Sequence, residues 1–465
     1  MGQRERGLDL YALPLAWAEA ALALALGAIT LGSKSLWFDE VYSVTTAGGS
    51  WDAMYRSWRH RDPNMSLYDV LLRSWRVLGT SDAAQRSLSV LATAATVLVV
   101  FAIGRRLFGP RVGLIAGLVI AIAPFAVHYA QEARSYALAA LLVSLASYSF
   151  VVGIEDPRWL PWTGYAVFGA LAIYAHFFAA LVLVAHGASL FVLGRAEIPW
   201  RAVVRSGTAL VVLALPAVWL AATGPRDQLS WIGRPDLHGA FWQPASMAGG
   251  TALSLVFLVL VGIAVWFGVL RWRSLGVGRE SWRVAFVILW LGVPWALSLA
   301  YSLVFQPVFL DRYLIVSLPA LALAAAIGAS QLARQWAAVA LMAVVALSAV
   351  QVVIWYRGSA QEDWRAVTAF TAAHAQPGDG IAFCLPELRR PFDYYARRAT
   401  SPHQPRDVGA HAATWPDRVW LVRGHEFAAK HAMCGLVGAL APYGVASDTS
   451  FPGIQLQLYQ RASSR

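Results

Sequence analysis

Charged side chains are scarce in this sequence. Asp, Glu, Lys and Arg make up 14% of its 465 residues, whereas a typical soluble domain contains about 25%. Hydrophobic residues account for 58%, which favours a polytopic membrane protein over a large soluble core. The 21 tryptophans and 16 tyrosines fit this class, because their rings favour membrane–water interfaces.

Lysine is nearly absent, with Lys34 and Lys430 alone, so the net charge of +11 comes from arginine. In a membrane protein such charge is first explained by loops that set orientation, and no nucleic-acid-binding motif indicates a nucleic-acid partner. The sequence also lacks a Walker-A loop, a GxGxxG after a strand, HExxH and GxSxG. Nothing therefore supports a cytosolic nucleotide site.

Long apolar runs predict about eleven transmembrane helices, the first one retained because no small-residue cleavage site follows it. Loop arginines place the N-terminus in the cytoplasm. The outer face then receives residues 32–86, a polar turn near 128–136, the stretch near 305–312 and the C-terminal part. The predicted spans are 13–31, 87–104, 112–128, 136–153, 160–178, 179–195, 205–222, 250–270, 283–303, 312–330 and 334–355.

The first outer loop, residues 32–86, contains two amphipathic patterns separated by Pro63. "WDAMYRSWRH" and "MSLYDVLLRSWRVLG" both carry apolar residues at helical spacing. We interpret them as interfacial helices lying at the membrane surface. Residues 1–356 are accordingly predicted to form one membrane-embedded module.

The composition becomes more polar from Arg357 onward. "EDWRAVTAFTAAHA" predicts a helix, and "GIAFCL", "RVWLVRG" and "IQLQLYQ" predict strands. Residues 357–465 should thus form a small α/β domain outside the cytoplasm. The only two cysteines, Cys384 and Cys434, lie here, and either a disulfide or two buried thiols fits them.

The stretch "SLWFDEVYS" at 35–43 contains two adjacent acids, Asp39 and Glu40. They are either a solvated pair at the end of a span or a pair of catalytic residues. A carboxylate at the membrane surface can remove a proton from an acceptor hydroxyl, while its neighbour holds a cation or the substrate.

A second polar run, "HYAQEARSYAL" at 128–138, lies between two spans. On a helix, His128, Glu132 and Tyr136 would share one face, whereas Arg134 would project elsewhere. Such a run is costly beside lipid unless it faces a cavity or pairs internally. A substrate site and a structural ion network both satisfy this requirement.

Arg312 and Tyr313, in "FQPVFLDRYLI", begin the tenth predicted span. A guanidinium can bind the phosphate of a lipid-linked donor in bidentate fashion, and a snorkelling anchor is the alternative. His176, in "YAHFF", is placed at the same face. A lone histidine there is more often structural than a ligand.

In order along the chain, several motifs resemble the GT-C superfamily of membrane glycosyltransferases. The similarity is to bacterial proteins related to protein O-mannosyltransferases and lipid A aminoarabinose transferases. It covers about the first 355 residues, and "DWRAVTAF" with "PGDGIAF" is similar to the outer domain of many members. The motifs are "LWFDEVYS", "NMSLYDVLLRSW", "QRSLSVL", "GRRLFG", "PFAVHYAQEARSYAL" and "DRYLIVSLPAL".

The resemblance implies an inverting sugar transfer from a polyprenyl phosphate, with Asp39 as catalytic base and Glu40 as its partner. It implies that Glu132 and Arg134 lie near donor or acceptor and that Arg312 meets the donor phosphate. Many relatives have His-Pro-Pro-Leu-Tyr where this chain has Asn64-Met65-Ser66-Leu67-Tyr68. The other candidate binding residues are His128, Tyr136, Tyr313, Asn64, Tyr68 and His176.

The sequence leaves the metal, the sugar and the transport alternative open. Some GT-C enzymes use a divalent metal such as Mg²⁺ or Mn²⁺ and others do not, so Glu40 and Glu132 are candidate ligands only. The sugar is mannose or a pentose such as arabinofuranose, and the acceptor is a glycan, lipid or protein of the cell envelope. A flippase for lipid-linked saccharides is the alternative function; it would favour mid-span charges and internal repeats.

Overall fold

The computed structural model divides the chain into two compact units. The first unit consists of Met1–Ile29, Ser50–Gly79 and Ala84–Arg357, and the second of Thr30–Gly49, Thr80–Ala83 and Gly358–Arg465. The second unit therefore joins the C-terminal segment to the part of the first loop that carries the acid pair. The described residues are 3–224, 229, 231–359, 361–399, 404–409, 415–424 and 436–461.

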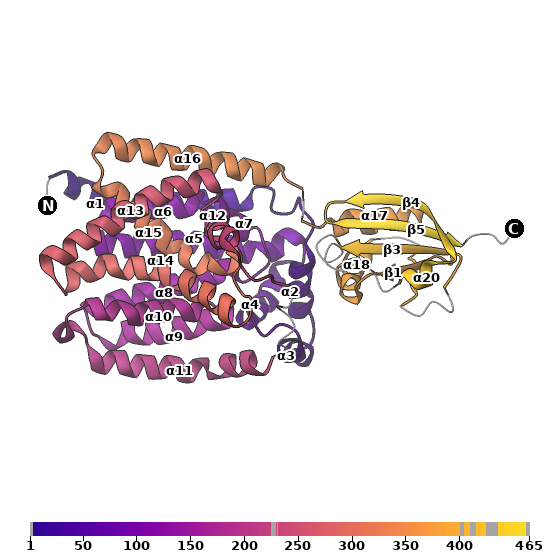
Figure 1. Ribbon diagram of the computed structural model, residues 1–465, viewed down its shortest axis with the longest axis horizontal. Helices are drawn as coiled ribbons and strands as arrows, with labels where there is room; N and C mark the ends of the chain where they lie inside the picture. The colour runs from indigo at the N-terminus through magenta and orange to yellow at the C-terminus, as the bar shows by residue number, and fades with distance from the viewer. Residues whose placement is uncertain are drawn as a thin grey trace. The chain divides into compact units, whose positions relative to one another are not determined.

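The first unit is a bundle of long helices that run side by side (Figure 1). Two short helices, α3 (Trp51–His60) and α4 (Ser66–Trp75), confirm the helices predicted on either side of Pro63. The bundle helices are α1 (Gln3–Ala28), α5 (Asp82–Phe108), α6 (Pro110–Ile122), α7 (Pro124–Ala130), α8 (Tyr136–Glu155), α9 (Trp159–Ala175), α10 (Ala179–Ser189), α11 (Trp200–Thr223), α12 (Leu237–Met247), α13 (Thr251–Leu275), α14 (Arg279–Val304), the 3₁₀ helix η5 (Asp311–Ser317), α15 (Leu318–Gln331) and α16 (Arg334–Arg357).

Every predicted span is largely helical, but the predicted number of eleven is too high. Within the described ranges, eight helices are long and apolar enough to cross a membrane, or nine if the bent pair α6–α7 is one span. The region 160–195 was expected to supply two spans. It forms α9, with 17 residues, and α10, with 11, whereas a spanning helix needs about 20.

The bend between α6 and α7 measures 56° and has a local cause. Pro124 begins α7 and has no backbone N–H to donate, so the hydrogen-bond ladder breaks after Ile122. The bend directs α7 away from the axis of α6. The polar run that follows begins at the end of this short helix.

The second unit contains a five-stranded mixed sheet of order β2-β1-β3-β5-β4 (Figure 1). The three predicted strands correspond to β1 (Gly380–Phe383), β3 (Arg418–Gly424) and β5 (Ile454–Arg461), and the predicted helix to α17 (Trp364–His374). β1 pairs parallel with β2 and β3, whereas β5 is antiparallel to β3 and β4. The remaining elements are β2 (Arg406–Asp407), β4 (Tyr443–Phe451), α18 (Arg389–Ala396), α20 (Val437–Leu440) and α2 (Phe38–Gly48).

Candidate functional site

Asp39 and Glu40 occupy the first turn of α2, within the second unit. Glu40 is fully buried, and its Oε2 accepts a hydrogen bond from the Trp37 backbone N–H at 3.2 Å. Asp39 is partly exposed. The pair is therefore not a solvated helix end: one acid is buried and supports the start of α2, and its neighbour remains accessible.

An ion cluster centred on the buried Asp82 lies in the same unit. Its carboxylate accepts hydrogen bonds from Arg365 at 2.6 Å, from Arg398 at 3.1 Å and from the Tyr395 hydroxyl at 2.6 Å. Burial, followed by the charge of Asp82, raises the pKa of Tyr395 above its ordinary value, so this hydroxyl remains a donor. Sequence reasoning missed this cluster because Asp82 is 283 to 316 residues away from its three partners.

The polar run of the first unit is not one helix, so the predicted shared face is wrong. α7 ends at Ala130, a turn follows, and α8 begins at Tyr136. His128 and Glu132 nevertheless meet, with 3.1 Å between Nε2 and Oε1. The imidazole of His128 also stacks on Trp355, with ring centroids 3.9 Å apart. Sequence reasoning did not find Trp355, which comes from the end of α16.

Arg134 lies in that turn and is buried. Its Nη1 is 3.7 Å from Oδ2 of Asp62, in the segment between α3 and α4. The backbone carbonyl of Arg134 accepts a hydrogen bond from Ser89, whose hydroxyl is 3.1 Å from that of Tyr68. Tyr68 thus supports the turn that presents Arg134. The side-chain contacts of this turn are therefore His128 with Glu132 and Arg134 with Asp62.

A row of rings joins this turn to the start of η5. Tyr136 lies 5.8 Å from His176, and His176 lies 5.0 Å from Tyr313, measured between ring centroids. His176 follows the end of α9 and is fully buried. Burial, then the charges of Arg134 and Arg312, lower the pKa of His176. The imidazole of His176 is therefore neutral near pH 7.

Arg312 is held by aromatic rings and by its neighbour Asp311. Its guanidinium carbon lies 5.2 Å from the ring centre of Trp231 and 5.7 Å from that of Tyr313. The Asp311 carboxylate accepts hydrogen bonds from the backbone N–H of Arg312 at 2.6 Å and from the Ser246 hydroxyl at 2.6 Å. Helix α12 therefore anchors the turn that carries Arg312.

Asn64 has a structural contact with the same region. Its Oδ1 accepts a hydrogen bond from the Phe177 backbone N–H at 2.9 Å, directly after His176. All nine binding candidates of the first unit consequently belong to one connected region. They are Asn64, Tyr68, His128, Glu132, Arg134, Tyr136, His176, Arg312 and Tyr313. Asp39 and Glu40 belong to the other unit.

Oε2 of Glu132 and Nε2 of His176 are buried in this region and make no hydrogen bond within the described part of the chain. The two residues are 3% and 0% exposed. An unpaired buried polar atom costs about 1–3 kcal/mol, and such atoms are common where a protein binds a ligand or water. We define Glu132, Arg134, His176 and Arg312 as the polar cluster.

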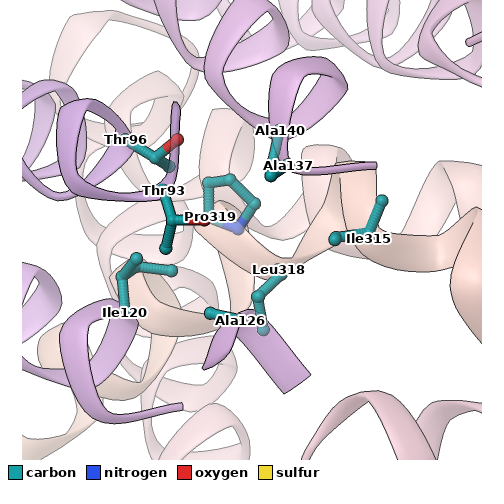
Figure 2. A pocket seen from close by; sticks show the side chains of 9 residues that line it. All are labelled: Thr93, Thr96, Ile120, Ala126, Ala137, Ala140, Ile315, Leu318 and Pro319. Carbon is teal, nitrogen blue, oxygen red and sulfur yellow. The ribbon is translucent and has the colours of Figure 1, made fainter. Parts of the chain in front are cut away.

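A small cavity lies in the first unit, lined by residues of α5, α6, α7, α8, η5 and α15 (Figure 2). Its volume of about 10 Å³ admits roughly one water molecule. The Thr93 and Thr96 hydroxyls donate hydrogen bonds to carbonyls of their own helix and are therefore satisfied. The other side chains that line the cavity are apolar. This cavity is too small for a sugar. The lining residues are Thr93, Thr96, Ile120, Ala126, Ala137, Ala140, Ile315, Leu318 and Pro319.

The metal and disulfide predictions have different outcomes. Over the described residues, no group of three or more His, Cys, Asp or Glu side chains could hold a metal ion. Within these residues Glu40 and Glu132 are not part of a ligand set, and a metal role for either acid stays a prediction. Cys384 follows β1, but Cys434 lies outside the described residues, so their pairing stays a prediction.

Sequence comparison identifies the class of protein. Residues 70–221 match the family model described as dolichyl-phosphate-mannose-protein mannosyltransferase. This segment, about a third of the chain, is similar to that family of glycosyltransferases. The resemblance found in the sequence, and the expected glycosyltransferase activity class, are thereby confirmed. No curated protein sequence matches the chain.

The fold of this glycosyltransferase is similar to those of two groups of solved structures. ArnT from Cupriavidus metallidurans in the apo state has a TM-score of 0.62 at 13% identity, covering 95% of this chain and 97% of ArnT. The same ArnT bound to undecaprenyl phosphate gives 0.59 at 14% identity, with coverages of 96% and 98%. The Archaeoglobus fulgidus oligosaccharyltransferase with Zn and sulfate gives 0.57 at 12% identity, with coverages of 96% and 73%.

These similarities show an ArnT-like fold and a multi-pass membrane protein. A metal is present in the oligosaccharyltransferase complex. In this glycosyltransferase, the described residues near Glu132 offer a histidine, a carboxylate and arginines instead of a set of metal ligands.

Proposed function

We propose that the protein moves a sugar from a polyprenyl-phosphate donor to a hydroxyl group of a cell-envelope glycan, lipid or protein. The observation that carries this proposal is the row of rings Tyr136, His176 and Tyr313 in an ArnT-like bundle, with Arg134 over its first ring and Arg312 over its last. Two guanidinium groups in a water-poor site suit a phosphate. The undecaprenyl phosphate bound to ArnT supports the same donor class.

The proposed reaction is a single displacement. Asp39 accepts the proton of the acceptor hydroxyl, and the hydroxyl oxygen forms a bond to the anomeric carbon of the donor. The bond from that carbon to the phosphate oxygen breaks, and the polyprenyl phosphate leaves with the electron pair. Arg134 and Arg312 stabilise the negative charge of the phosphate. One displacement inverts the anomeric configuration, and the phosphate leaving group needs no general acid.

Turnover of defined donors tests this function. The purified full-length protein in nanodiscs is incubated with polyprenyl-phosphate mannose or polyprenyl-phosphate arabinofuranose and a hydroxyl acceptor. We expect one donor to release polyprenyl phosphate only when acceptor is present, with an inverted glycosidic bond detected by NMR. A flippase would instead move the intact donor across a liposome bilayer without cleaving it. That outcome would contradict the proposal.

We further propose that the polar cluster lies on the outer side of the membrane and the N-terminus in the cytoplasm. The helix ends remote from the polar cluster carry exposed arginines, including Arg105, Arg201 and Arg334. Such residues favour the cytoplasmic side. The internal charge distribution of the bundle therefore supports the orientation expected from the loops.

Cysteine labelling of intact cells tests this orientation. Val277 lies between α13 and α14, and Val445 lies on β4; both are 55% exposed, so they form a matched pair. A membrane-impermeant maleimide should label Val445→Cys in intact cells, and Val277→Cys only after permeabilisation. The parent chain, with its two native cysteines, gives the background. The opposite labelling pattern would reverse the orientation.

A further inference from the structure

The segment immediately before α2 is bound to the C-terminal part of the second unit through consecutive residues. Ser35 donates from Oγ to the Glu362 carbonyl at 3.0 Å and accepts from the Trp364 N–H at 3.1 Å. The Leu36 N–H donates to the Tyr395 hydroxyl at 2.7 Å. Ser35 and Leu36 are 4% and 0% exposed, so these are buried bonds at a fixed backbone position.

Glu362 makes the contact closest to the acid pair. Its Oε2 accepts a hydrogen bond at 2.9 Å from the N–H of Phe38, the first residue of α2. The same oxygen accepts from the indole N–H of Trp364 at 2.7 Å. A carboxylate at the first turn of a helix satisfies an amide that has no partner within the helix, and it interacts favourably with the helix dipole.

The backbone of Glu362 is itself held in place. Asp363 begins α17 as its N-cap, accepting from the Ala366 N–H at 3.0 Å, and its own N–H donates to the Pro452 carbonyl at 2.9 Å. Gly453 has a φ of +67°, and a Cβ there would lie 2.0 Å from the Gln361 carbonyl oxygen. This close approach requires glycine. Glu362 is thus fixed between the β4–β5 turn and α2.

We propose that Glu362 is a positioning residue, which acts through the Phe38 amide to fix the first turn of α2 and thereby the place of Asp39. This inference rests on the proposed role of Asp39 as base. Glu40, within α2, accepts a hydrogen bond from the backbone N–H of Trp37. Glu362, in the C-terminal segment, accepts one from the backbone N–H of Phe38. The C-terminal segment of the second unit then contributes to the transfer reaction, since it sets the position of the base Asp39.

Two substitutions of Glu362 test the anchor directly by hydrogen exchange in full-length protein. Glu362→Ala should speed exchange of a peptide covering residues 36–43 by about ten- to a hundredfold, because a charged hydrogen bond at the helix start is lost. Glu362→Gln keeps an acceptor oxygen and should restore much of the protection. Glu387→Ala removes an exposed carboxylate of the same unit and is the control. Unchanged exchange in Glu362→Ala would overturn the anchor.

Kinetics then separate positioning from general stabilisation. Glu362→Ala should lower kcat by about 10- to 100-fold, as expected for a misplaced catalytic group. The donor KM and the Kd for undecaprenyl phosphate should stay within about twofold, and Glu362→Gln should recover most of kcat. An unchanged kcat in Glu362→Ala, together with an inactive Asp39→Asn, would overturn the positioning role alone. Full activity of Asp39→Asn would instead refute the proposed role of Asp39.

Discussion

Asp39→Asn should slow sugar transfer by about 10²- to 10⁴-fold, which is the usual contribution of a general base. The amide is nearly the same size as the carboxylate but cannot accept the proton of the acceptor hydroxyl. The change is made at a partly exposed residue in the first turn of α2, so the fold should tolerate it. Release of polyprenyl phosphate from the active donor, measured by mass spectrometry, gives the rate.

Asp52→Asn is the matched control for this experiment. Asp52 lies on α3 of the same loop, forms an exposed ion pair with Arg56 and has an exposed side chain. It should retain parental turnover, since an exposed pair of this kind contributes about 0–1 kcal/mol. Asp39→Asn should also bind undecaprenyl phosphate like the parent. Near-parental transfer by Asp39→Asn would show that another group accepts the proton.

Glu40→Gln is expected to have a smaller effect than Asp39→Asn, because the two acids differ in their surroundings. The buried Oε2 of Glu40 receives the Trp37 amide, and a glutamine oxygen can accept the same hydrogen bond. The sequence suggested that the two acids have different tasks. The local geometry indicates that Glu40 supports the start of α2.

The helical architecture could be predicted from apolar runs, but the number of spans could not. Each run coincides with a helix, because burial or lipid contact requires a continuous apolar surface. The length of a run does not show where it breaks. Pro124 bends one run by 56°, and His176 ends another after 17 residues. Proline was a local signal for the first break, whereas no proline marks the second.

The binding candidates could be predicted because polar residues at helix ends must pair or face a cavity. Their partners were harder to find. Asp62 and Trp355 contact site residues, and Glu362 contacts Phe38 beside Asp39, over sequence separations of up to 324 residues. No local sequence pattern predicts such contacts. Strand β4 was also missed, because most of its side chains are partly or fully exposed and the apolar alternation that marks a strand is weak.

Arg312→Ala should weaken binding of undecaprenyl phosphate by about 10- to 100-fold, because a hydrogen bond to a charged group contributes about 1.5–3 kcal/mol. Arg312 is half-buried and lies over Trp231 and Tyr313. These rings hold the planar guanidinium in one orientation. Arg312→Lys keeps the charge but loses the planar fork, so it should recover only part of the affinity. Native mass spectrometry of the full-length protein measures both variants.

Arg334→Ala provides the control, since Arg334 is an exposed arginine at the start of α16, at the end of the bundle remote from the polar cluster. It should bind undecaprenyl phosphate like the parent chain. Undecaprenol, which has the same tail without the phosphate, should not distinguish Arg312→Ala from the parent. If Arg312→Ala binds undecaprenyl phosphate normally, the arginine serves as a membrane anchor. Arg134, which also acts on His176, would then be the principal cation available for the donor phosphate.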